Sequence, residues 1–185
     1  MGGKPARLIY QGRAPSFAGV DNIHLELPPD ARKGDRGSQS IIGFIFPMRL
    51  PRLFPILDTD TLARRGCPIA AAGEGMLEGG ARILEFRHKG TYNREVFDEL
   101  ERLAACCREA GALLVVNDRA DIALLLDAGV HVGQDDLPAA EARRLLGPGR
   151  VVGLSTHNAA QLKAGDREPV DYLALGPIFP TASKA

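Results

Sequence analysis

The hydrophobic residues of this chain are grouped in short continuous runs from residue 53 onward, and most of these runs end in a small cluster of polar residues. Runs of Val, Ile and Leu without alternation are typical of parallel strands that are covered on both faces. The pattern predicts strands over residues 53–58, 82–87, 112–117, 129–133, 151–155 and 171–176.

Helical patterns separate several of these predicted strands. Residues 93–110 carry apolar side chains with the period of an amphipathic helix, and Gly111 follows where helices commonly end. Shorter helices are predicted over residues 121–128 and 138–146, and Asn158 is a candidate N-cap for one more. Alternating strands and helices indicate an α/β fold with a parallel sheet.

A parallel sheet of this kind is either an open doubly wound sheet or a closed barrel. No predicted strand leads into a GxGxxG or GxxxxGK[ST] loop, which disfavours a dinucleotide or P-loop site. Polar clusters at nearly every strand end favour the barrel, whose sites are assembled from many strand ends. We therefore expect a (β/α)₈ TIM-barrel type of fold that is incomplete, with about six βα units.

The first 47 residues differ from the rest. Gly, Pro, Ser, Arg and Asp are scattered there without a lasting period, a composition that buries little apolar area. Residues 41–46 are either a short strand or an apolar patch in a disordered segment. We expect residues 1–47 to be an irregular N-terminal extension and residues 48–185 to form the partial barrel.

Composition limits the partners. The 23 basic residues balance the 23 acidic ones, so no overall field attracts nucleic acid. No apolar stretch is long enough to span a membrane, and no signal peptide is recognisable. Three cysteines without CxxC spacing fit a reducing compartment, so we expect a cytoplasmic protein.

Two basic residues end the predicted strand at 82–87. Arg87 and Lys89 are two positions apart and point to the same side, where they would clamp a phosphate or be a solvated strand end. Glu85 is in phase with them and needs a partner if it faces inward; Arg87 is the candidate.

Two carboxylates follow later strands. Asp118 and Asp136 are either ligands of Mg²⁺, which prefers oxygen donors, or helix caps. Asn117 is either a diphosphate ligand or a turn residue. Ser155 offers a hydroxyl, and His157 is a candidate acid or base near neutral pH. His131 lies within an apolar strand and is interpreted as a core histidine.

Read in order, these clusters resemble the thiamine-phosphate synthase family. The resemblance rests on five segments, which are Glu85–Lys89, Asn117–Arg119, His131–Asp136, Gly153–His157 and Gly176–Lys184. It implies an enzyme that joins hydroxymethylpyrimidine diphosphate to thiazole phosphate with Mg²⁺, releasing pyrophosphate without a protein nucleophile. Glu85 and Ser183 replace the Gln and Thr of the family pattern.

The resemblance also assigns roles. Substrates would be held by Glu85, Arg87, Lys89, Asn117, Ser155, Thr181, Ser183 and Lys184, and the metal by Asp118 and Asp136. Thr181 and Ser183 would bind the thiazole phosphate. The chain ends soon after Lys184, so two barrel strands are expected to be missing, and an open sheet edge would permit self-association.

Two other functions stay open from the sequence. A related thiazole tautomerase would use His157 for proton transfer and would not need the diphosphate residues. A truncated fragment that cannot close its barrel would be inactive. The synthase is favoured by the combination of Arg87, Lys89, Asn117, Asp118 and Asp136.

Overall fold

The computed structural model describes residues 50–176 together with two short N-terminal strands. The strands are β1 (Arg7–Leu8), β2 (Ile23–Glu26), β3 (Ile56–Asp58), β4 (Ile83–Arg87), β5 (Leu113–Asn117), β6 (Gly129–Val132), β7 (Val152–Thr156) and β8 (Tyr172–Leu175). The helices are α1 (Thr59–Arg64), α2 (Ile69–Glu78), α3 (Arg94–Glu109), α4 (Ala120–Leu125), α5 (Ala139–Leu146) and α6 (Ala159–Gly165).

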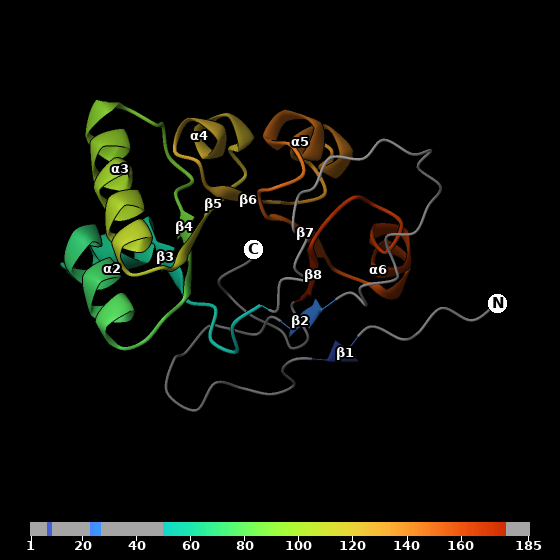
Figure 1. The fold of residues 1–185 in the computed structure, drawn as a ribbon, viewed down its shortest axis with the longest axis horizontal. Coiled ribbons are helices and arrows are strands. Elements are labelled where there is room, and N and C mark those ends of the chain that lie inside the picture. The colour runs from blue at the N-terminus through green and yellow to red at the C-terminus, as the bar shows by residue number, and fades with distance from the viewer. Residues whose placement is uncertain (1–6, 9–22, 27–49, 177–185) are drawn as a thin grey trace.

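The strands from β3 to β8 are parallel and lie side by side in chain order. A doubly wound sheet reverses its order at a switch point, whereas a barrel adds its strands in sequence. Figure 1 shows the helices in an arc around one side of the curled sheet. The expected α/β barrel type of fold with six parallel strands in the described part is therefore confirmed.

The core lies between the sheet and its helices. Alternate strand residues, such as Phe86, Val116 and Leu154, belong to the apolar cluster that packs against the helices. Because successive side chains of a strand point to opposite faces, the residues between them face the concave side of the sheet. This concave side carries polar residues of the predicted site.

Capping residues explain where the main helices begin. The side chain of Asn93 accepts a hydrogen bond from Val96 N at 2.9 Å, and Asn158 does the same for Gln161 N at 2.9 Å. Gly111, with φ of 62°, follows the end of α3 in the left-handed conformation that suits glycine. These features agree with the sequence analysis, but α1 and α2 were not placed by it.

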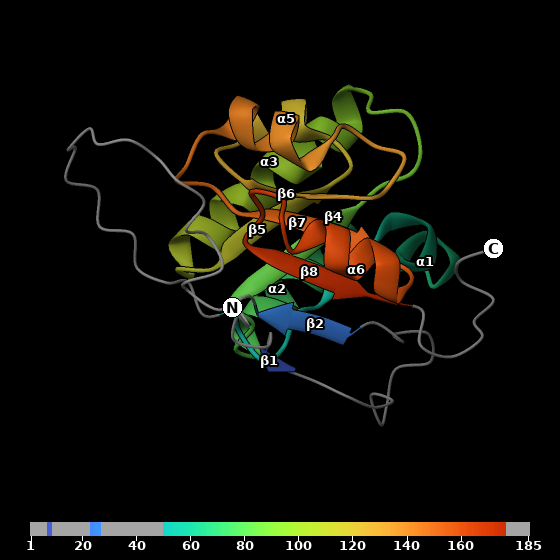
Figure 2. The same ribbon diagram turned by 90° about the vertical axis from the view of Figure 1, so that its right-hand side faces the viewer.

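The N-terminal region contains an unexpected pairing. Strand β2 runs antiparallel along the edge of β8, and β1 pairs with β2 (Figure 2). The β8 edge, which the sequence analysis expected to be open, is thus occupied in the structure. The candidate strand at residues 41–46 lies outside the described residues. No helix in the described part of the chain has the length and apolar character of a membrane span.

Candidate functional site at the carboxyl ends of the strands

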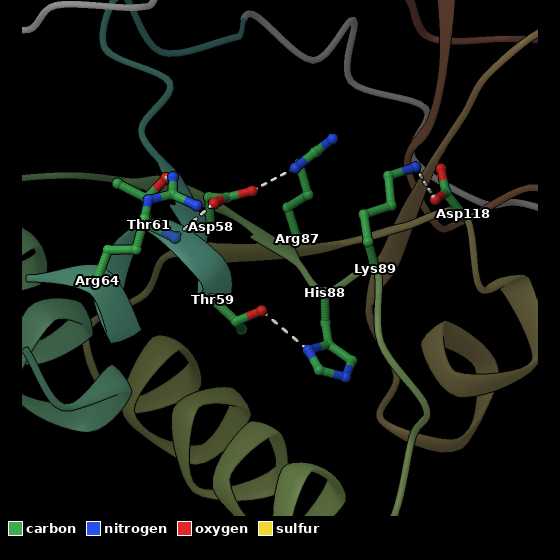
Figure 3. A network of polar contacts seen from close by, with 8 residues as sticks. All are labelled: Asp58, Thr59, Thr61, Arg64, Arg87, His88, Lys89 and Asp118. Carbon is green, nitrogen blue, oxygen red and sulfur yellow. Dashed lines mark hydrogen bonds and ion pairs between the residues drawn. The ribbon is translucent and has the colours of Figure 1, made fainter. Parts of the chain in front are cut away.

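Two cations project from the carboxyl end of β4. Arg87 and Lys89 extend to the same side, whereas His88 between them points away, as Figure 3 shows. Arg87 is paired with Asp58 at the end of the neighbouring strand β3, and the Lys89 Nζ lies 2.5 Å from an oxygen of Asp118. The predicted common orientation is confirmed. Each cation bridges its own strand end to that of an adjacent strand.

Asp58, the last residue of the predicted strand at 53–58, is a member of this edge to which the sequence analysis gave no role. Its carboxylate accepts a hydrogen bond from Thr61 N at 2.8 Å and so caps α1, and its other oxygen pairs with Arg87. Burial alone would raise the pKa of Asp58, but the hydrogen bonds from Thr61 and Arg87 outweigh it and lower the pKa. Asp58 therefore stays ionised and holds the Arg87 guanidinium at the strand end.

Asp118 and Asp136 come together beside Lys89. Burial raises the pKa of Asp118, and the Asp136 carboxylate raises it further, against the lowering effect of Lys89. Asp118 has φ of 64°, a left-handed conformation that is uncommon for residues other than glycine. Its own N–H donates to the His131 carbonyl at 2.7 Å, and this bond ties the strained turn to β6.

The helix-capping alternatives for these two aspartates are wrong. Helix α4 begins after Arg119, and α5 begins after Pro138; neither helix has a side-chain cap. The Asp136 carboxylate instead accepts a hydrogen bond from Gly133 N at 2.7 Å within its own loop. Neither carboxylate is therefore engaged at a helix N-terminus.

Asn117 carries an unsatisfied donor. Its side chain is buried, and its amide nitrogen has no hydrogen-bond partner in the described part of the chain. A buried polar group without a partner destabilises a fold by about 1–3 kcal/mol, and such a group is usually satisfied by an ordered water, an ion or a ligand. Asn117 directly precedes Asp118, and the residue before it, Val116, pairs with Phe86, the residue before Arg87. Asn117 is therefore beside Arg87 in the register of the sheet and beside Asp118 in the chain.

Glu85 is buried on the concave side of β4, with 4% of its surface exposed. The sequence analysis expected Arg87 as its partner, and the structure engages Arg87 with Asp58 instead. The negative charge of Glu85 acts on Tyr172: burial raises the pKa of this phenol well above its usual range, and Glu85 and Asp171 contribute to the rise.

Ser155 lies at the end of β7 and contacts His131. The His131 Nε2 is 2.7 Å from the Ser155 hydroxyl, and its Nδ1 is 2.8 Å from the Tyr172 hydroxyl. Gln134 donates to the Ser155 carbonyl at 2.6 Å. Both ring nitrogens of His131 are thus occupied, as expected for a buried histidine.

His157 lies further along the same edge. Its Nδ1 is 2.6 Å from the carbonyl of Gly176, which can only accept, so this nitrogen carries a proton. Three predicted substrate ligands, Thr181, Ser183 and Lys184, lie outside the described residues.

A separate hollow of about 260 Å³ opens at the opposite end of the sheet. It is lined by residues at or just before the amino ends of β5, β6 and β7, including Leu113, Asp127 and Arg150. None of the predicted site residues lines it. The candidate site at the carboxyl ends of the strands is therefore distinct from this hollow.

The residues at the edge fit a magnesium ion bound together with a phosphorylated ligand. No three His, Cys, Asp or Glu side chains of the described residues gather as a protein-only metal site. Mg²⁺ usually takes one or two carboxylates and completes its shell with water and substrate phosphates. Asp118 and Asp136 supply such a pair, and the unpaired Asn117 amide offers a donor to the ligand.

The sequential parallel strands and the polar edge define an α/β protein of barrel type with its candidate site at the carboxyl ends of the strands. Comparison with protein families gives a match to the model for thiamine monophosphate synthase over residues 54–185. The chain belongs to this family.

Individual relatives agree with this assignment. The chain is 47% identical to the thiamine-phosphate synthase of Chlorobium luteolum over 136 residues, which cover 73% of this chain and 61% of the relative. It is 46% identical to the thiamine-phosphate synthase of Pelotomaculum thermopropionicum over 110 residues, or 59% of this chain and 50% of the relative. The chain thus spans between half and three fifths of the length of these relatives.

A solved structure shares the fold. The thiamine phosphate pyrophosphorylase of Pyrococcus furiosus superposes with a TM-score of 0.61 and 32% sequence identity. The superposition covers 71% of this chain and 63% of that protein. The family resemblance found in the sequence is confirmed by the family model, by the individual relatives and by the solved structure.

Proposed function

We propose that the protein couples hydroxymethylpyrimidine diphosphate to thiazole phosphate, forming thiamine phosphate and pyrophosphate. The observation that carries this proposal is the unsatisfied amide of Asn117, a residue that neighbours Arg87 in the register of the sheet and directly precedes Asp118, whose carboxylate interacts with that of Asp136. A diphosphate with a bound metal ion would accept a hydrogen bond from Asn117 and pair with Arg87, and its metal ion would pair with the two carboxylates. Membership of the thiamine monophosphate synthase family supports the same substrates.

The diphosphate would be bound by groups that donate hydrogen bonds or carry positive charge. Arg87 presents a planar fork suited to phosphate oxygens, and Lys89 presents a point charge. Asn117 and Ser155 add neutral donors from the next strands, and Lys184 completes the set by its place in the family motif. Glu85 would lie below this group on the concave side of β4.

Two further groups of residues have proposed roles. Thr181 and Ser183 would bind the thiazole phosphate. Asp118 and Asp136 would hold Mg²⁺, which when bound stabilises the negative charge that develops on a departing diphosphate.

The protein's own residues contribute to the departure of the diphosphate in a defined way. The Asp58 carboxylate fixes the Arg87 guanidinium before substrate arrives, so little reorganisation is needed when charge develops. Lys89 is paired with Asp118 and lies at an exposed position, which leaves it able to turn to a phosphate oxygen. No side chain needs to attack the substrate, because the thiazole nitrogen is the nucleophile.

A direct assay tests the proposal. The purified 185-residue chain is incubated with both substrates and Mg²⁺, and thiamine phosphate is measured. We expect product with the wild-type chain and a loss of at least about 100-fold for Asp118→Ala, since that change removes a proposed metal ligand. Asp127→Ala is the matched control, because Asp127 borders the hollow at the opposite end of the sheet.

The outcomes separate the alternatives. A folded wild-type chain that forms no product contradicts the proposed activity. Thiazole tautomerisation that survives Asp118→Ala and is lost in His157→Asn would instead identify the tautomerase.

The proposed surroundings follow from the same function. The partners would be the two small-molecule substrates and Mg²⁺, and the three unpaired cysteine thiols fit a cytoplasmic location. Self-association would use one of the two edge strands of the described sheet, β3 or β1, because β2 covers β8. Residues 1–47 would be an extension outside the partial barrel at 48–185, with β2 as its point of attachment.

A further inference from the structure

We propose that His131 and Tyr172 form a buried hydrogen-bond relay that positions the Ser155 hydroxyl as a donor to an anionic phosphate oxygen. The relay runs from the Tyr172 hydroxyl to His131 Nδ1, and from His131 Nε2 to Ser155 Oγ. The inference rests on the proposed function, since Ser155 is a proposed ligand of the diphosphate.

The relay depends on the register of three adjacent strands. His131 in β6 pairs with Gly153 in β7, and Gly153 pairs with Tyr172 in β8. A side chain on the middle strand would separate the outer two, and a Cβ at position 153 would lie 2.1 Å from Cζ of Tyr172. Glycine at this position therefore lets the tyrosine ring lie across β7 and reach the histidine.

The two rings are held firmly against each other. Their centroids are 5.4 Å apart with an interplanar angle of 24°, and the Tyr172 hydroxyl is 2.8 Å from His131 Nδ1. Tyr172 has none of its surface exposed and His131 has 6% exposed. The histidine ring thus has one orientation in which both nitrogens are bonded.

Ser155 stands at the open end of this relay. It lies two residues beyond Gly153 on the same strand face, it is half-buried, and its Oγ is 2.7 Å from His131 Nε2. Gln134 holds the Ser155 backbone by donating to its carbonyl at 2.6 Å. The Ser155 backbone is therefore held by Gln134, and the contact with His131 restricts the rotation of the hydroxyl.

The direction of the hydrogen bonds decides what Ser155 offers to a ligand. If Tyr172 donates to Nδ1, the proton of the neutral His131 ring is on Nε2 and is donated to Ser155 Oγ. The serine proton is then free for a phosphate oxygen. In the reverse direction the serine would donate to His131 and present only lone pairs, which an anion repels. In the first direction, which is the one we propose, His131 and Tyr172 are positioning residues for a donor serine.

The test measures affinity for inorganic pyrophosphate in the presence of Mg²⁺ by calorimetry, with the full 185-residue chain. Ser155→Ala should weaken binding about tenfold or more, as expected for loss of a hydrogen bond to a charged group. His131→Met and Tyr172→Phe should each weaken it about three- to tenfold. In the Ser155→Ala background the same two changes should have no further effect, because they act through the serine.

Two controls separate positioning from folding. Tyr172→Phe keeps the ring and its packing, and His131→Gln keeps a hydrogen-bonding side chain, so Gln should restore affinity relative to Met. The ¹⁵N shifts of the His131 ring should report a proton on Nε2 in the wild-type chain. Thermal melting of each variant shows whether the folded state is retained.

Each outcome has a defined meaning. Additive effects in the Ser155→Ala background, or a proton on Nδ1, would overturn the relay while pyrophosphate binding by the wild-type chain persists. If the wild-type chain binds no pyrophosphate at all, the proposed function fails, and the role of Ser155 as a phosphate donor fails with it.

Discussion

Arg143 in α5 joins four separate groups at the amino ends of β7 and β8. It donates to the carbonyls of Pro169, Gly147 and Arg150 at 2.9, 3.0 and 2.6 Å, and to the Asp171 carboxylate at 2.6 Å. The Arg143 and Asp171 side chains are only 16% and 10% exposed. Replacement of Arg143 by Ala should therefore be strongly destabilising.

The size of the loss follows from these contacts. Removal of one partner from a buried ion pair costs about 3–5 kcal/mol, because the other charge stays buried without its counter-ion. The Asp171 carboxylate keeps a hydrogen bond from Val152 N at 2.8 Å but loses the cation. The three carbonyls lose their donor as well, although some of them will bind water instead. We expect the free energy of unfolding to fall by about 3–5 kcal/mol in Arg143→Ala, and by a smaller amount in Arg143→Lys, which keeps the charge without the fork.

The neighbouring arginine supplies the control. Arg144 pairs with Glu141 on the same helix, but these side chains are 81% and 45% exposed. Exposed pairs contribute little, so Arg144→Ala should leave the melting temperature unchanged within about 2 °C.

Urea denaturation followed by circular dichroism measures the three variants and the wild-type chain under one set of conditions. Equal losses for Arg143→Ala and Arg144→Ala would refute the reasoning, as would a loss below about 1 kcal/mol for Arg143→Ala. Either result would mean that the network at the amino ends of β7 and β8 contributes no more than a surface pair.

Three further predictions concern the glycine, thiol and aspartate positions. Gly153→Ala should destabilise the fold by about 1–3 kcal/mol through its clash with Tyr172, whereas Gly149→Ala, with no atom near its Cβ, should not; melting curves compare them. Burial, and after it the neighbouring Cys106, raises the pKa of the Cys107 thiol from 9.0 to about 11. The unfolded chain therefore ionises this thiol first, and the free energy of unfolding should fall by about 3 kcal/mol between pH 9 and pH 11. Urea titrations across this range should show a shallower fall for Cys107→Ala. Asp118→Gly should raise the free energy of unfolding by about 1 kcal/mol, because glycine adopts a positive φ without strain; urea unfolding measures this. The same variant should lose Mg²⁺-dependent binding of pyrophosphate, which calorimetry measures.

Most of the sheet could be predicted from the sequence because its parallel strands, three to five residues long, are rich in Val, Ile and Leu. The helix at Arg94–Glu109 was equally visible, since its apolar period and the Asn93 cap are local features. Helix α2 was missed because its sequence contains Gly73 and Gly75, which disfavour an isolated helix. Its packing explains the glycine: a Cβ at position 73 would lie 2.4 Å from Leu103 of α3.

The N-terminal strands were missed for a related reason. Arg7–Leu8 and Ile23–Glu26 are too short to show a period. The second of them pairs with β8, about 150 residues away, and the first pairs only with the second. Propensity rules cannot detect a partner of that kind.

For the site, strand ends identified the charged residues, and the structure brings Arg87, Lys89, Asp118 and Asp136 to one edge. The pairings themselves were not predictable. The Arg87 partner is Asp58 of β3, and the link between His131 and Tyr172 depends on the register of three strands. The only signal in the sequence was that Asp58 also ends an apolar run.

Backbone strain alone does not mark the functional edge, because Asp118 and Asp127 have nearly the same positive φ, 64° and 56°. Asp127 forms an ion pair with Arg150, and its side chain is 76% exposed to solvent. Asp118 differs in being brought close to a second carboxylate, which opposes its ionisation, and in following the unsatisfied Asn117 amide. Three unfavourable features in adjacent residues destabilise the free protein, and one metal-bound phosphate ligand would relieve two of them. This coincidence, rather than the strain by itself, is the reason to place ligand binding at the end of β5.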